Sequence, residues 1–487
     1  MTSPGISSSF EAVSIETCLA ELEDGRKIHQ GWSPQCDKSA AADNEWGVLK
    51  TTSIQAGRFE PEHNKRLPAK LSPRPHLEVR AGDILLTCAG PRHRCGVSCL
   101  VRQTRGRVMI SGKMYRFRAN PERIRPDYLE AFLQSETARQ AIDRMKTGIS
   151  DSGLNLTHGR FRQLVIPLAP IDEQQRVIAE IEKQFTRLDA GVTSLKRVQI
   201  ALKRYRASVL QAACEGRLVP TEAELARKEN RSYESADLLL KRILKERREK
   251  WNGKRKYKEP VGPNADAASG LQKGWTSGTV DQLASLVTDG DHNPPKRHPF
   301  GVPHLTAKNV RGWQLVTNDC TFISPADTER VFKRYRPRAG DLIVTCVGTV
   351  GRTALVPPDL EFSPDRNLAA IRPASSGISM RFLNYVLSSP RYQERMGGAS
   401  GSTAQPHLYL GDLRTFEVPI PPLAEQNRIV AEVDRRMSVI DGLEEGVKYS
   451  LQRATRLRRS ILQRAFTSEI TSPIRGDMET EASKIPT

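Results

Sequence analysis

The chain has 487 residues, a formal net charge of +19 and a sequence pI of about 9.7. Its length exceeds what one hydrophobic core can serve and predicts roughly two to four domains, and its charge favours nucleic acid over a membrane surface as a partner. The sequence has neither an apolar run of membrane-spanning length nor a signal-peptide core, so we expect a cytoplasmic protein with no membrane contact.

Residues 1–167 are predicted to form a first mixed α/β domain. Short apolar runs predict strands at Ile84–Cys88, Val108–Ile110 and Met114–Phe117. Asp83, in the turn that opens the first of these strands, is expected to cap that turn. The spacing of apolar residues over Pro126–Met145 predicts one helix with a single buried face.

Residues 168–262 are predicted to form a central helical region and a linker. Heptad spacing indicates a coiled-coil seam, carried by Ile181, Leu188, Leu195, Leu202 and Val209. A further helix is predicted at Ser235–Ile243. The basic run Lys245–Lys258 that follows fits either a solvated linker or a phosphate contact.

Residues 263–419 repeat the order of the first domain, and residues 420–472 form a second long helix. The strand is predicted at Leu342–Cys346, a turn at Gly348–Gly351, and a helix near Met380–Met396 that Pro390 interrupts. The second helix has its own heptad seam, at Val433, Ile440, Val447, Ala454 and Ile461. The polar residues 473–487 are predicted to be a disordered tail.

These parallels reflect an internal repeat. Ile171–Leu218 and Leu423–Ile470 share more than ten identical residues at one constant separation, and upstream Arg80–Cys88 matches Arg338–Cys346 at a slightly different separation. Insertions are tolerated in loops but not within a long helix, so each copy is a loop-rich domain followed by a helix.

Two seams of equal length most simply bury each other. We therefore predict an α+β fold in which two mixed α/β domains are joined by a long antiparallel helical coiled coil with a pseudo-two-fold internal repeat. Two ordinary amphipathic helices, each packed on its own domain, are the alternative.

No motif for catalysis or metal binding is convincing. Asn293–Lys296 resembles the Asn-Pro-Pro-aromatic loop of amino-methyltransferases, but Lys296 has no ring to stack on a base. Gly348–Arg352 lacks the Gly-Lys-Ser/Thr ending of a phosphate-binding loop. The eight cysteines do not have zinc-ribbon spacing, and Cys88 and Cys346 are expected to be small core residues. A basic chain with two similar units and no catalytic motif is predicted to recognise a polyanion or to act as a scaffold.

Several motifs occur in a characteristic order: Leu271–Trp275, Asp289–His292, Leu305–Val310, Pro337–Leu342, Gly348–Arg352 and Val418–Gln426, with Gly216–Pro220 closing the first long helix. Their order and duplication resemble the DNA-specificity subunit of a type I restriction–modification enzyme. The first unit departs from the pattern, since Gly90–Gly96 replaces the Gly-Thr-Val-Gly-Arg turn and its start lacks Lys-Gly-Trp.

The resemblance implies a non-catalytic specificity subunit that reads a bipartite, asymmetric site on double-stranded DNA, with a spacer set by the helices. It implies two methyltransferase (M) subunits, which bind S-adenosylmethionine, and two restriction (R) subunits, which use ATP and magnesium. No cofactor or metal is expected in this chain.

Base edges are read in the major groove by Arg or Lys at guanine and by Asn or Gln at adenine, so we expect readers in loops that share one edge of each unit. The predicted DNA-binding residues of the first unit are Lys50, Thr51, Thr52, Arg92, Arg94, Ser152 and Asn155. Those of the second unit are His292, Lys296, Lys308, Asn309, Arg311, Thr349, Arg352, Ser402, Gln405 and His407.

Two other functions stay open. A non-catalytic coiled-coil protein-interaction scaffold would be basic by accident, and salt-dependent binding to duplex DNA distinguishes the two hypotheses. A self-contained DNA-modifying enzyme would transfer methyl groups as a single purified chain.

Overall fold

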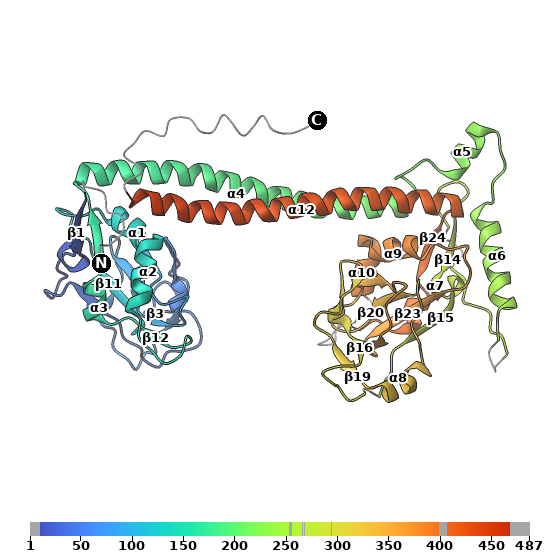
Figure 1. Cartoon of the computed structure of the whole chain (residues 1–487), viewed down its shortest axis with the longest axis horizontal. Coiled ribbons are helices and arrows are strands. Elements are labelled where there is room, and N and C mark those ends of the chain that lie inside the picture. Colours follow the sequence, from blue (N-terminus) through green and yellow to red (C-terminus); the bar gives the residue numbers. More distant parts are fainter. Residues whose placement is uncertain are drawn as a thin grey trace. The chain divides into compact units, whose positions relative to one another are not determined.

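The structure is a computed structural model, and it describes residues 10–252, 256–264, 266, 268–293, 295–398 and 407–467 (Figure 1). The predicted tail at 473–487 lies outside these residues. The chain divides into two compact units. The first comprises the described residues of Met1–Lys196 and Lys448–Thr487, and the second those of Arg197–Val447. Each long helix, α4 (Ile171–Cys214) and α12 (Leu423–Ala465), contributes one part to each unit.

The first unit is built on an antiparallel sheet with strand order β2-β11-β7-β9: Ile28–Gln30, Met114–Phe117, Ile84–Thr87 and Ser98–Leu100. A second sheet has the order β10-β3-β6: Val108–Met109, Gly47–Leu49 and Asn64–Arg66. The remaining strands are β1 (Glu11–Ser14), β4 (Ile54–Gln55), β5 (Arg58–Phe59), β8 (Ala89–Gly90), β12 (Leu154–Asn155) and β13 (Val165–Leu168). The helices are η1 (Ile15–Cys18), η2 (Thr51–Ser53), η3 (Pro75–Leu77), α1 (Pro126–Gln134), α2 (Glu136–Met145) and α3 (His158–Arg162).

The second unit repeats this topology. Its main sheet has the order β15-β23-β20-β21: Ala284–Asp289, Leu368–Pro373, Leu342–Thr345 and Thr353–Leu355. Its second sheet has the order β19-β16-β22: Thr321–Ile323, Val302–Leu305 and Ser363–Pro364. The remaining strands are β14 (Thr276–Thr279), β17 (Val310–Arg311), β18 (Gln314–Leu315) and β24 (Glu417–Ile420). The helices are α5 (Glu222–Glu229), α6 (Ala236–Glu249), α7 (Val280–Leu283), η4 (Ala307–Asn309), α8 (Pro325–Phe332), α9 (Met380–Ser388), α10 (Pro390–Gly398) and α11 (Leu410–Arg414).

The helix predicted over Pro126–Met145 is wrong as a single element, because Ser135 divides it into α1 and α2. Ser135 has extended backbone, and its hydroxyl accepts a hydrogen bond from the Ala138 amide at 3.2 Å, which caps α2. The break predicted at Pro390 is confirmed, since α9 ends at Ser388 and α10 begins at Pro390. The helix predicted from Ser235 is also confirmed, but it extends beyond Ile243 to Glu249.

The long helices pack against each other in antiparallel fashion, as predicted. In the first unit Arg458 Nη1 donates to Asp189 Oδ1 at 2.6 Å, and in the second Arg206 donates to Asp441. The repeat makes Arg206 the counterpart of Arg458 and Asp189 the counterpart of Asp441, so one ion pair occurs twice with the helices exchanged. Every predicted seam residue is buried or half-buried. Glu444, which does not fit the apolar seam, accepts from Arg206 at 3.2 Å.

The core of the first unit includes the end of α12. Ile461, Leu462 and Phe466 are buried together with residues of α1. The ring of Phe466 lies 5.2 Å from Tyr128 and 5.4 Å from Phe132, in edge-to-face contacts. This domain core therefore combines residues from both ends of the chain.

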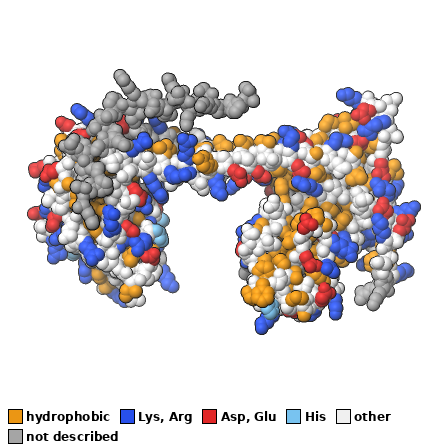
Figure 2. Space-filling model, viewed as in Figure 1, with side chains coloured by type: hydrophobic (Ala, Val, Ile, Leu, Met, Phe, Trp, Pro, Cys, Tyr) orange, Lys and Arg blue, Asp and Glu red, His pale blue; other side chains and the backbone are white. Residues whose placement is uncertain are grey.

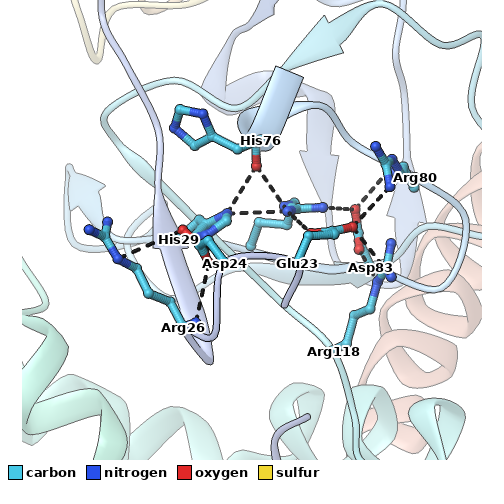
Figure 3. A network of polar contacts seen from close by, with 9 residues as sticks. Glu23, Asp24, Arg26, His29, His76, Arg80, Asp83 and Arg118 are labelled. Atoms are coloured by element: carbon cyan, nitrogen blue, oxygen red, sulfur yellow. Dashed lines mark hydrogen bonds and ion pairs between the residues drawn. The ribbon is translucent and has the colours of Figure 1, made fainter. Parts of the chain in front are cut away.

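Asp83 and Asp341 cap equivalent turns, which confirms the prediction for Asp83. The Asp83 carboxylate accepts from the Arg80 amide at 2.7 Å, and the Asp341 carboxylate accepts from the Arg338 amide at 2.9 Å. In the first unit the carboxylate also faces Arg116, whose side chain is 1% exposed and donates to Asp83 at 3.1 Å. Figure 3 shows this network, in which the Arg116 guanidinium also contacts Glu23, the His29 ring and the His76 carbonyl.

We expect Asp83→Ala to destabilise the first unit by about 3–5 kcal/mol, because it leaves a buried guanidinium without its main counter-charge. Glu16→Ala is the control, since Glu16 and Arg162 form an exposed pair at 3.6 Å, and it should cost less than about 1 kcal/mol. Denaturant unfolding followed by circular dichroism measures both changes. Equal unfolding midpoints for the two variants would contradict the assigned role of Asp83.

Candidate nucleic-acid interface

Three segments meet at one edge of the main sheet in the first unit. The turn Gly90–Gly96 comes directly after strands β7 and β8. Arg94 in this turn contacts the hairpin Thr51–Phe59, because its guanidinium donates to the Ile54 carbonyl at 2.8 Å and to the Thr51 carbonyl. The same turn meets the segment Thr147–Asn155, because the Arg92 amide donates to the Asp151 carbonyl at 2.9 Å and β12 pairs with β8.

The second unit has the same arrangement. The turn Gly348–Arg352 follows β20, and Arg352 Nη1 lies 3.5 Å from the Val310 carbonyl of the hairpin Ala307–Leu315. His407 forms a bridge with Val347, in the position that Asn155 occupies beside Ala89 in the first unit. The residues after β15 share this edge, because β15 and β20 both run antiparallel to β23.

In the first unit the two arginines of the turn each hold one loop. Arg92 forms ion pairs with Asp143 at 2.8 Å and with Asp151 at 3.0 Å, and its side chain is half exposed. Arg94 is half-buried and directs its guanidinium to carbonyl groups of the hairpin, so we correct its assignment from base reader to a residue that positions the hairpin. Lys50, Thr52, Ser152 and Asn155 are exposed, and Thr51 is half-buried.

In the second unit Asn309 also needs correction. It is 0% exposed, its amide donates to the Val316 carbonyl at 2.9 Å, and its oxygen accepts from the Thr306 amide at 3.0 Å. A buried side chain with its hydrogen bonds made within its own loop holds that loop and does not reach DNA. The other described predictions are at the surface: His292, Lys296, Lys308, Arg311, Thr349 and Arg352 are exposed and His407 is half-buried. Ser402 and Gln405 lie outside the described residues.

Several of the exposed residues are oriented by neighbouring groups. Lys308 donates to the Asp319 carbonyl at 2.6 Å, and Arg311 pairs with the Asp319 carboxylate at 2.9 Å. His292 lies 2.9 Å from Asp289. Burial alone would raise the pKa of Asp289, but hydrogen bonds from Arg334 and His292 outweigh burial and lower the pKa. Asp289 thus stays a carboxylate that holds the loop.

Sequence reasoning missed a basic cleft in the first unit. This cleft, of about 690 Å³, lies between the turn Gly90–Gly96, α2 and the end of α12. Its cationic lining residues are Arg92, Arg94, Arg139, Lys146, Arg458 and Arg459, against the acids Glu136 and Asp143. Hydrogen bonds from Lys146 and then Arg92 lower the pKa of Asp143. The sequence holds one indication of this cleft. Arg459 of the second long helix occupies the position that Ala207 has in the first, so the second helix carries an additional positive charge there.

Among the described residues, no group of three or more His, Cys, Asp and Glu side chains has an arrangement that holds a metal ion. Cys88 and Cys346 are core residues, as predicted, and burial raises the pKa of each thiol to about 12.

No helix in the described part of the chain is long and apolar enough to cross a membrane. Lys and Arg side chains are spread over the visible faces of both units (Figure 2).

Comparisons with known proteins agree on one family. Residues 305–453 match the family model described as type I restriction modification DNA specificity domain. The EcoEI specificity subunit of Escherichia coli is 38% identical over 170 residues, which are 35% of this chain and 29% of that protein. The EcoBI specificity subunit of Escherichia coli is 26% identical over 326 residues, 66% of this chain and 62% of that protein. Over these parts the chain is similar to the type I restriction–modification specificity subunits.

The fold of the whole chain agrees with this family. A chain from a solved structure on complex assembly and conformational transition of the type I restriction–modification system has a TM-score of 0.62 and 19% sequence identity. The match covers 96% of this chain and 99% of that chain. The chain spans 29% and 62% of the lengths of the two curated relatives named above.

We expect the two arginines of the first turn to order different loops. Arg94→Ala removes the hydrogen bonds to Thr51 and Ile54 and should speed amide exchange in Thr51–Phe59 by about tenfold, while Arg92→Ala should do the same in Thr147–Asn155. Hydrogen-exchange mass spectrometry measures both, and each variant is the control for the other. Faster exchange in the same segment for both variants would contradict this assignment.

Proposed function

We propose that this protein is the DNA-reading, non-catalytic subunit of a type I restriction–modification complex and recognises a bipartite, asymmetric sequence. One observation carries the proposal: the same three-segment edge occurs once in each unit, on an equivalent sheet, with different exposed side chains. Two edges with the same backbone arrangement but different exposed side chains are suited to recognising two different half-sites.

The equivalent positions differ in the groups that they offer. In the hairpins Thr52 of the first unit corresponds to Lys308 of the second, and after the strands Asn155 corresponds to His407. Lysine favours the acceptors of guanine, whereas asparagine favours adenine. These differences support an asymmetric target and argue against a continuous palindrome.

The proposed division of labour follows the repeat. Residues 1–167 and 263–419 would be the target-recognition domains, and residues 168–262 and 420–472 the helical regions between them. The gap between half-sites would depend on α4 and α12, which have 44 and 43 residues and are each on the order of 65 Å long.

The proposed protein partners are two M subunits, carrying S-adenosylmethionine, and two R subunits, using ATP and magnesium. Figure 2 shows hydrophobic side chains along the long helices. Exposed apolar residues there include Val198, Ile200 and Tyr205 on α4 and Val439 and Leu443 on α12. Such a surface supports a protein partner, because apolar rows are usually covered.

The test is reconstitution with the cognate M subunits, followed by methylation mapping of genomic DNA. We expect methylation at two short, different sequence elements separated by a fixed number of unspecified bases. DNA binding should also weaken steeply with salt, as phosphate contacts require. Methylation of a continuous palindrome would contradict the bipartite reading, and absence of salt-dependent binding would favour the scaffold hypothesis.

Arg352 is exposed in the Gly turn, and among the described residues its guanidinium makes one long contact, to the Val310 carbonyl. If it reads a base, Arg352→Ala should cost about 1–3 kcal/mol at one position of one half-site. Arg336→Ala is the matched control, because Arg336 is exposed but precedes β20 at the opposite end of that strand. Binding to a library of half-site variants measures the effect. A uniform loss over all sequences would instead identify a phosphate contact.

A further inference from the structure

The segment Thr147–Asn155 of the first unit presents a large apolar side chain at its tip. Ile149 has a relative exposure of 109%, the highest among the exposed large hydrophobic residues of the described chain. Its neighbours Ser150, Asp151 and Ser152 are polar and exposed. A single exposed aliphatic residue needs no explanation by itself, but this one is carried by a segment that is held at both ends and lies beside a basic cleft.

The segment is closed at its base. The amides of Thr147 and Asn155 each donate to the carbonyl of the other, at 2.8 and 2.7 Å. Gly148 has φ of +147°, and a Cβ there would lie 2.8 Å from the Gly153 carbonyl oxygen, so the two sides of the loop are in close contact. Ile149 is therefore carried by a loop whose ends are fixed.

A second attachment fixes the far side of the loop to the turn Gly90–Gly96. The Arg92 amide donates to the Asp151 carbonyl at 2.9 Å, and its guanidinium donates to Asp151 Oδ1 at 3.0 and 3.1 Å. A loop that is ordered before binding loses less conformational entropy on binding. Its apolar tip is thus prepared for a partner surface.

The surroundings of the loop indicate which partner. Lys146, directly before the loop, and Arg92, which holds it, both line the basic cleft that also contains Arg139, Arg458 and Arg459. Six cationic side chains line the cleft, and Glu136, Asp143, Asp151 and Asp189 pair with four of them. The positive charge that remains favours a polyanion at this place. Duplex DNA combines phosphates with apolar base surface in its grooves, so it matches both the cleft and the tip.

We propose that Ile149 enters a groove of the half-site read by the first unit and packs against its bases, while the basic cleft holds neighbouring phosphates. This inference rests on the proposed function and adds a residue that contributes specificity through apolar contact. Such contact takes one of two forms, packing on a thymine methyl group or insertion between base steps.

The experiment uses the full chain with its cognate M subunits, the cognate duplex and an unrelated duplex of equal length. We expect Ile149→Ala to weaken binding to the cognate duplex by about tenfold or more and to leave the unrelated duplex unchanged. Ile149→Lys should also weaken cognate binding but strengthen binding to the unrelated duplex, because it adds a charge near the backbone. Val165→Ala is the control, since Val165 is a 52% exposed aliphatic residue on β13 of the same unit, and it should change neither affinity.

Two modified duplexes identify the contact. Replacing each thymine of the half-site by uracil removes one methyl group, and a methyl contact predicts that one replacement weakens the wild type but has no effect on Ile149→Ala. Insertion predicts instead that 2-aminopurine at one step brightens with the wild type and not with Ile149→Ala. A loss of affinity with neither signal overturns direct base contact.

Other outcomes separate this inference from the proposed function. If the wild-type complex discriminates the cognate duplex and Ile149→Ala binds it equally well, the inference is overturned and the proposed function stands. If the wild type does not discriminate, both are overturned. If Ile149→Ala no longer co-purifies with the M subunits, the loop contacts protein and the DNA contact is overturned.

Discussion

The antiparallel pairing of α4 and α12 is the constraint on which the rest of the structure depends. The pairing is defined by an ion pair that the repeat duplicates, Arg458 with Asp189 and Arg206 with Asp441. At the surface such pairs contribute little energy, and the buried seam residues supply most of the stabilisation. The ion pairs instead set which residues of the two helices are opposite each other, as charged flanking positions do in coiled coils.

The pairing also completes the domain cores. In the first unit the end of α12 contributes Phe466 to the aromatic cluster around Tyr128 and Phe132. The core therefore needs residues that are more than 300 positions apart, and contacts of this kind carry a loop-closure entropy cost that slows folding. In the second unit Glu425, near the start of α12, accepts from Trp275 at 2.9 Å and from the Glu222 amide at 2.8 Å.

At the edge of each unit, the residues that hold the loops differ from the residues that are exposed on the surface. Arg94 donates to carbonyl groups of the neighbouring hairpin Thr51–Phe59 and holds that hairpin in place. Asn309 makes its hydrogen bonds within its own loop and keeps that loop in shape. Lys308, His292 and Arg352 are exposed on the resulting surface. A rigid framework with variable exposed groups allows a change of target without a change of fold, because the exposed groups contribute little to stability. Buried side chains such as Asn309 do not share this freedom.

The sequence by itself determined the internal repeat, the strand cores, the turn caps and the length and seam of the long helices, because each depends on local periodicity or on identity between the copies. It missed the break at Ser135, where a hydroxyl that caps a backbone amide competes with helix continuation. Only the tertiary structure decided which polar residues face outward and which fold back, as for Arg94 and Asn309, since the direction of a side chain depends on the backbone groups that the folded chain places around it. It also brought Arg458 and Arg459 beside the turn Gly90–Gly96, because the end of α12 packs into the core of the first unit.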